Sequence, residues 1–110
     1  MDVKDYGSVK VVYAPKRFDA QASREVEEVL LKVIESGAKT VLCNFMQTEY
    51  ISSAGLRVLL TAMKNLKKSE GQLCICSASS FVIEVLETSG LNNVLKIFGT
   101  EEDALKNLSS

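Results

Sequence analysis

The chain has 110 residues, 46% of them hydrophobic and 25% charged, and its 13 basic and 14 acidic side chains leave a net charge of −1. This size and composition are typical of one ordinary globular domain, so we expect a single domain over residues 1–110. The balanced charge provides no basic face for nucleic acid or anionic lipid, and no apolar run approaches the ~18 residues that span a membrane.

The first part of the chain alternates between strand and helix patterns. β-prone residues predict a strand over 9–13, and a short edge strand over 3–6 is expected to precede it across a Gly-Ser turn. Apolar residues then recur at helical spacing over 22–34, which predicts an amphipathic helix that ends at Gly37. An apolar run over 40–45 predicts a buried strand next.

Two adjacent serines, Ser52 and Ser53, separate that strand from a second predicted helix over about 54–68. Either serine can cap this helix, because a hydroxyl accepts hydrogen bonds from the free N–H groups at a helix start. The same end of a helix tolerates an added anion, so a serine there suits three roles: cap, nucleophile or phosphate acceptor. We expect the apolar stripe of this helix to belong to the core, and that stripe consists of Leu56, Leu59, Leu60 and Met63.

The third strand–helix unit follows at once. Gly71 is expected to end the second helix, and residues 73–76 predict another central strand. Ser79 or Ser80 can cap a short helix that Gly90 closes.

The chain is expected to finish with a strand over 94–98 and a last helix, before which Thr100 and Asp103 form a capping box. Strands separated by helices require right-handed crossovers, so we predict an α/β fold. Its sheet should be small, mixed and largely parallel, with four or five strands and about four helices. Functional loops of such sheets lie at the carboxyl ends of the strands, which places the turn at Ser52 and Ser53 on that rim.

Cysteine and histidine usage bears on chemistry. Cys43, Cys74 and Cys76 lie inside apolar runs without a Cys-x-x-Cys pair, which favours buried thiols in a reducing cytoplasm over a redox or metal site. The sequence contains no histidine, which removes Ser-His-Asp and Cys-His catalysis and histidine metal sites. No glycine-rich phosphate loop is present, and the N-terminus lacks the apolar segment of a signal peptide. We therefore expect a cytoplasmic protein with no catalytic residues, no metal and no cofactor.

Ser53-Ala54-Gly55-Leu56, which follows an apolar strand, resembles the motif of STAS domains in bacterial anti-sigma factor antagonists. Phe18-Asp19 is similar to the Leu/Phe-Asp pair that leads into the family's first helix, and Asn44 stands where the family carries Asp or Asn. Residues 85–91 also resemble the sequence pattern of the family. The resemblance covers nearly the whole chain and implies a single STAS-type domain.

The resemblance implies a partner switch rather than an enzyme. In that family the unphosphorylated domain binds an anti-sigma factor with serine kinase activity and so releases the sigma factor. The kinase then phosphorylates a serine at the helix start, and a PP2C-type phosphatase restores it. By position the acceptor would be Ser53, whereas Ser52 stands where many members have Asp. Partner contacts are expected from Asp19, Ser52, Ser53, Ala54, Gly55 and Arg57.

Arg57 lies four residues after Ser53 and could donate to a phosphate there. Lys16 and Arg17 would also favour a phosphate if the fold brings them close. On local sequence alone, however, helix capping is the favoured role for Ser52, Ser53 and Asp19, and only the resemblance favours a regulatory role for Ser53. Gly55 is as well suited to close packing of the helix against a neighbouring backbone as to a partner contact.

Other functions stay open at this point. STAS domains also occur as scaffold subunits of stress-sensing assemblies and as accessories of membrane transporters. A nucleotide hydrolase is the weakest alternative, because its usual catalytic groups are missing. Neither the sigma factor, the kinase nor the trigger is identifiable from the sequence, and a monomer is expected in the free state.

Overall fold

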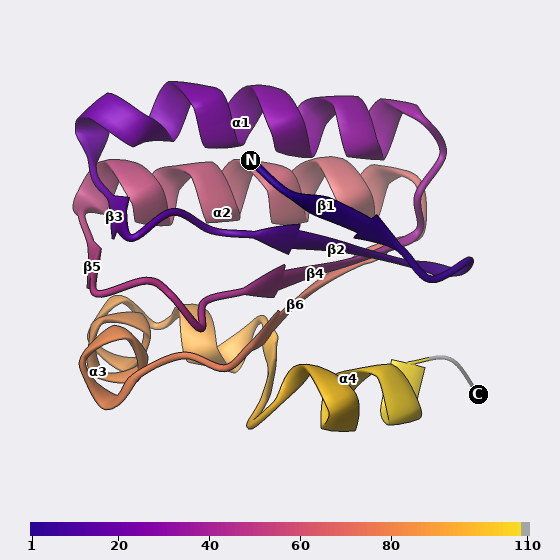
Figure 1. Ribbon diagram of the computed structural model, residues 1–110. Helices are drawn as coiled ribbons and strands as arrows, with labels where there is room; N and C mark the ends of the chain where they lie inside the picture. Colours follow the sequence, from indigo (N-terminus) through magenta and orange to yellow (C-terminus); the bar gives the residue numbers. More distant parts are fainter. Residues whose placement is uncertain (109–110) are drawn as a thin grey trace.

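The computed structural model describes residues 1–108. A central sheet of five strands is built, in spatial order, from β1 (Val3–Asp5), β2 (Val9–Tyr13), β4 (Thr40–Asn44), β6 (Gln72–Cys76) and β7 (Lys96–Phe98) (Figure 1). β1 pairs antiparallel with β2, and the other three pairs are parallel. The prediction of a mixed, largely parallel α/β sheet is therefore confirmed.

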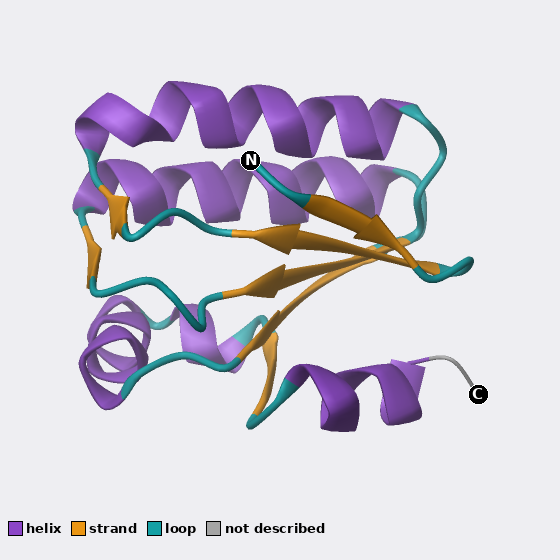
Figure 2. Cartoon of the chain, in the orientation of Figure 1, coloured by secondary structure: helices purple, strands orange, loops and turns teal. Residues whose placement is uncertain are grey.

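Helices cover both faces of this sheet. α1 (Ala20–Glu35) and α2 (Ser53–Lys68) run side by side over one face, whereas α4 (Glu101–Leu108) covers the other (Figure 2). α3 (Ser80–Ser89) adds Val82 and Leu86 to the core beneath α1 and α2. Parallel strands need such crossovers, since a hairpin turn cannot join them.

Alternation along the strands produces two cores, because successive strand residues point to opposite faces of the sheet. On β4, Val41 and Cys43 face the large core under α1, α2 and α3. Leu42, between them, faces the smaller core under α4 together with Cys74 and Cys76 of β6. All three cysteines are buried free thiols, as expected.

Most helices begin and end where the sequence predicted. Gly37 has a φ of 99° and donates its N–H to Ile34 at 3.0 Å, so it ends α1 as expected. Ser79, rather than Ser80, caps α3, and Gly90 closes that helix with a φ of 81°. Half of the expected capping box is present, because the Thr100 hydroxyl accepts from the Asp103 N–H at 3.0 Å.

The end of α2 differs from the expectation. The helix stops at Lys68, and Glu70, not a glycine, takes the left-handed conformation with a φ of 62°. Gly71 is instead required by a close approach, since a Cβ there would clash with the carbonyl oxygen of Lys39. The glycine therefore lets β6 begin beside the entry to β4.

Two further expectations need correction. Leu59 and Met63 of the expected stripe on α2 are buried in the core, whereas Leu56 and Leu60 pack against the core and are only partly buried. The core face of this helix is shifted toward Val58 and Ala62. The last strand is also shorter than 94–98: Leu91–Asn93 forms a 3₁₀ turn and β7 begins at Lys96. The apolar residues before β7 serve the turn rather than the sheet.

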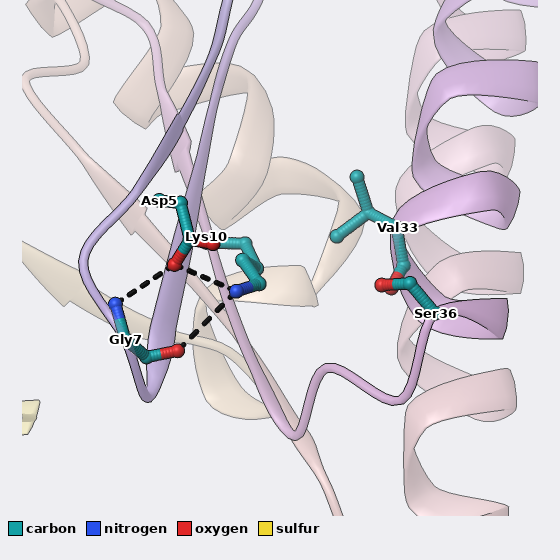
Figure 3. Close-up of polar contacts among 5 residues, drawn as sticks. All are labelled: Asp5, Gly7, Lys10, Val33 and Ser36. Carbon is teal, nitrogen blue, oxygen red and sulfur yellow. Dashed lines mark hydrogen bonds and ion pairs between the residues drawn. The ribbon is translucent and has the colours of Figure 1, made fainter.

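The turn between β1 and β2 is fastened by its own polar side chains (Figure 3). The Asp5 carboxylate accepts from the Gly7 N–H at 2.8 Å and lies 2.6 Å from the Lys10 ammonium, which also donates to the Gly7 carbonyl. Val33 and Ser36 face this cluster from the last turns of α1. This turn is thus at the opposite end of the molecule from the starts of α1 and α2 (Figure 1).

Candidate functional site

The rim at which α1 and α2 begin is organised by a second, two-stranded sheet. β3 (Arg17–Phe18) pairs in parallel with β5 (Tyr50–Ile51), and each strand leads directly into a helix (Figure 2). Because Phe18 lies opposite Ile51, the residues that follow them, Asp19 and Ser52, become neighbouring helix caps. The Ser52 N–H donates to the Phe18 carbonyl at 3.0 Å, which fixes this arrangement.

The two serines occupy different positions. Ser52 is the N-cap of α2: its backbone is extended, and its hydroxyl accepts from the Gly55 N–H at 3.4 Å. Ser53 is the first helical residue and is exposed. Within residues 1–108 its hydroxyl makes no hydrogen bond. Ser52 therefore has a capping role, and the Ser53 hydroxyl is free to react.

Asp19 caps α1 in the same way. One carboxylate oxygen accepts from the N–H groups of Gln21 and Ala22 at 3.1 and 3.0 Å. The other lies 3.6 Å from Nε of Arg17, so both oxygens are engaged. Asp19 remains partly exposed on the rim, beside the start of α2.

The remaining expected partner contacts differ in exposure. Gly55 is buried, and a Cβ there would lie 2.7 Å from the Phe18 carbonyl oxygen, so this glycine lets α2 pack against β3. Ala54 is partly buried, whereas Arg57 is exposed. The structure thus brings all six expected residues to one rim but gives Gly55 a packing role.

Arg57 and Ser53 border a shallow groove of about 390 Å³ between α2 and the end of α3. Its apolar lining comes from four residues, Leu56, Leu60, Leu91 and Val94. This groove accounts for the partial exposure of Leu56 and Leu60. Sequence periodicity could not reveal it, because it depends on where α3 docks.

A second feature that the sequence did not indicate is a column of stacked side chains from β3, β5 and α3. The Arg17 guanidinium lies 4.8 Å from the centre of the Tyr50 ring, and this ring stacks on Phe81 of α3 with 6.4 Å between ring centres. Phe81 is 47% exposed, and Met46 on the neighbouring loop is 71% exposed. Arginine and aromatic side chains gathered at a surface are typical of protein-binding sites, and here Arg17 and Phe81 are exposed while Tyr50 is half-buried.

The cations of the preceding loop are already paired. Lys16 lies 3.6 Å from the Glu49 carboxylate, and Arg17 lies 3.6 Å from that of Asp19. The fold does bring this loop beside the start of α2, as the β3–β5 pairing requires. The Lys16–Glu49 pair is largely exposed on both sides, so it is weak and available for exchange. The Arg17–Asp19 pair is exposed mainly on the arginine side.

Over residues 1–108 the structure contains no cluster of His, Cys, Asp or Glu that could hold a metal ion. Nor is any helix in this part of the chain long and apolar enough to cross a membrane. Burial raises the pKa of Cys43 to about 12, and that of Cys74 to about 11. The exposed Phe81 and Met46 side chains and the groove beside Arg57 are features of a binding surface.

Comparison with known proteins agrees with this architecture. The model of the STAS domain family matches residues 1–104. BtrV of Bordetella bronchiseptica, provisionally named an anti-sigma factor antagonist, is 33% identical over 82 residues, which cover 74% of this chain and 71% of BtrV. The anti-sigma-B factor antagonist of Staphylococcus aureus is 27% identical over 84 residues, covering 76% of this chain and 78% of that protein.

Solved structures of SpoIIAA, a Bacillus cell fate determinant, share the fold. The unphosphorylated form superposes with a TM-score of 0.85 at 23% identity, covering 98% of this chain and 95% of SpoIIAA. The phosphorylated form gives 0.76 at 22% identity and covers 96% of each chain. Family model, relatives and fold agree, so the chain belongs to the STAS domain family and, within it, to the anti-sigma factor antagonists.

Proposed function

We propose that this protein acts in the cytoplasm as a partner switch controlled by phosphorylation of Ser53. The unphosphorylated domain binds an anti-sigma factor with serine kinase activity, and this releases a sigma factor. Phosphorylation by that kinase ends the interaction, and a PP2C-type phosphatase restores it. The observation that carries the proposal is the separation of roles between Ser52, which caps α2, and Ser53, whose exposed hydroxyl is unbonded.

Electrostatics supports a switch at this place. A phosphoserine carries about −1.5 to −2 charges, which the positive end of α2 tolerates within the free domain. In an interface the same phosphate would be desolvated, and an unpaired buried ion costs several kcal/mol. A micromolar complex holds only about 8 kcal/mol in total, so one phosphate is sufficient to prevent binding. The neighbour SpoIIAA has itself been solved in a phosphorylated form.

The surface around Ser53 is suited to a protein partner. Phe81 supplies a large exposed ring stacked on the half-buried ring of Tyr50, and Arg17 and Arg57 supply exposed guanidinium groups. The names of the relatives, which are anti-sigma factor antagonists, support a regulatory role as well.

Phosphosite mapping after incubation with ATP and the serine-kinase anti-sigma factor of the same organism tests the proposal. We expect one phosphate on the wild type and on Ser52→Ala, and none on Ser53→Ala. Ser53→Asp should weaken binding to that kinase at least tenfold in calorimetry, while Ser53→Ala binds constitutively. Equal affinity for Ser53→Asp and Ser53→Ala would refute the switch and leave a scaffold or transporter-associated role.

A further inference from the structure

Arg57 lies on the rim at a position from which its side chain can reach Ser53. Arg57 lies one helical turn after Ser53, and both border the groove between α2 and α3. Residues four apart on a helix have Cβ atoms about 5–6 Å apart, and helical side chains lean toward the N-terminus. The Arg57 guanidinium can therefore reach back to a phosphate on Ser53.

Arg57 is also uncommitted. Within residues 1–108 its exposed side chain makes no ion pair, hydrogen bond or ring contact. The cations of the loop before α1 differ, since Lys16 is paired with Glu49 and Arg17 with Asp19 and Tyr50. Lys64, also exposed on α2, is eleven residues after Ser53, about 16 Å along the helix axis.

Resting on the proposed function, we propose that Arg57 is the residue through which the phosphate is sensed. In the unphosphorylated domain its guanidinium binds a carboxylate of the partner, whose adjacent apolar side chains enter the groove. In the phosphorylated domain the phosphate on Ser53 pairs with Arg57 instead. Phosphate and partner thus compete for one guanidinium.

The groove supports a partner segment of this chemistry. Its lining is apolar apart from Ser53, Arg57 and Ser89, with Val94 51% exposed at its border. An apolar floor with one free guanidinium at its edge is complementary to an apolar segment that carries an acidic residue. Arginine binds carboxylates and phosphates with the same planar, two-pronged geometry, so each can displace the other.

The first test needs no partner and no kinase. Phosphoserine is incorporated at position 53 during translation, and the ionisation of its phosphate is followed by ³¹P NMR as a function of pH. With Arg57→Gln we expect the second pKa of the phosphate to rise by about half a unit, as for loss of an exposed ion pair. Lys64→Gln also removes one positive charge, but further along α2. It should shift the second pKa of the phosphate by less than a quarter of the shift expected for Arg57→Gln. Equal shifts in both variants would overturn the pairing.

The second test measures binding of the unphosphorylated domain to the serine-kinase anti-sigma factor. Arg57→Gln should weaken binding about tenfold, Arg57→Lys less, and Lys64→Gln less than twofold. Unchanged affinity for Arg57→Gln would overturn the carboxylate contact. If the phosphate pKa shifts as expected but the wild type binds no anti-sigma factor, the proposed function fails while the pairing stands. Binding with an unshifted phosphate pKa refutes this inference alone.

Discussion

At the scale of single residues, two chemically identical neighbours on the rim, Ser52 and Ser53, have different structural roles. Ser52 and Ser53 have the same hydroxyl, but only Ser52 precedes the first helical turn, where N–H groups lack backbone partners. Its hydroxyl accepts from Gly55, while that of Ser53 is exposed. Substituting each serine should therefore change different properties.

We expect Ser52→Ala to lower the free energy of unfolding by about 1 kcal/mol, because a cap is lost. Ser53→Ala should be neutral or slightly stabilising, since alanine is the best helix former. Urea denaturation of both variants measures the difference. Equal losses would mean that the two hydroxyls share the capping role.

Gly55 provides a second prediction, in which two effects oppose each other. Alanine is favoured over glycine inside a helix by about 1 kcal/mol. At this position, however, a methyl group would lie 2.7 Å from the Phe18 carbonyl oxygen and 2.9 Å from Cγ1 of Ile51. Backbone at one side and a buried side chain at the other leave little room to relax.

Gly55→Ala should therefore destabilise the protein by about 1–3 kcal/mol, in the range of overpacked cores. Thr61→Ala, at an exposed position of the same helix, is the matched control and should have little effect. Both are measured by urea denaturation. A Gly55→Ala variant as stable as the wild type would show that α2 can move away from β3 at little cost.

At the scale of elements, α4 is attached to the sheet through its first residue. The Oε1 atom of Glu101 accepts from the Tyr13 hydroxyl at 2.5 Å and from the Asn44 amide at 2.9 Å, and Oε2 accepts from the Tyr6 hydroxyl at 3.3 Å. Burial raises the pKa of Glu101, but the hydrogen bonds from Tyr13, Asn44 and Tyr6 outweigh it and leave that pKa below 4.5. Burial and the neighbouring Glu101 carboxylate raise the pKa of Tyr13.

A depressed pKa of Glu101 makes this attachment dependent on pH. The carboxylate stabilises the fold fully well above pH 4.5, its ordinary pKa, and this contribution is lost as the pH falls through the lower pKa of the folded state. Glu101→Gln should thus lower the melting temperature at neutral pH. The gap to the wild type should narrow between about pH 6 and pH 3. A gap that stays constant over this range would rule out a contribution from the ionised carboxylate.

The hydrogen bonds around Glu101 also show which parts of the fold could not be predicted from the sequence. Periodicity identified the five sheet strands and four helices, because apolar spacing reports which face of an element is buried. It did not identify β3 and β5, whose two residues each pair only through tertiary contacts. It assigned Asn44 by resemblance alone, whereas the amide is buried and joins β4 to Glu101.

The candidate site, like the fold, was predictable in its local features but not in its tertiary contacts. The helix start at Ser52 and Ser53 follows from local chemistry, since a hydroxyl pair before an amphipathic pattern marks an N-terminus. The contact of Arg17 with Tyr50, and of Tyr50 with Phe81, depends instead on three elements meeting in space. Docking of α3 also decides that Leu56 and Leu60, which pack against the core, line a groove as well.

At the scale of the whole molecule, the sheet separates two cores, and more helices cover one core than the other. The face with Cys43 lies under three helices, α1, α2 and α3. The face with Cys74 and Cys76 is covered chiefly by Ala104, Leu105 and Leu108 of the eight-residue α4. Short elements with few buried contacts open locally at lower free energy than well-buried ones, so the second face should become accessible without global unfolding.

Thiol labelling would reveal this asymmetry. Burial raises the pKa of Cys43 to about 12 and the pKa values of Cys74 and Cys76 to about 11, so none should react near neutral pH while covered. With N-ethylmaleimide and mass spectrometry we expect Cys74 and Cys76 to be labelled at least tenfold faster than Cys43.

Glu101→Gln should widen that difference, because it loosens α4 and leaves the helices over Cys43 in place. Wild-type rates measured at several urea concentrations separate the two routes of exposure. Labelling through local opening depends weakly on urea, since little surface is exposed, whereas labelling through global unfolding depends steeply on it. If all three thiols react at one rate with one steep dependence, α4 opens only with the rest of the fold. The two cores would then form a single cooperative unit, and changes at the Ser53 rim could affect the opposite face of the sheet.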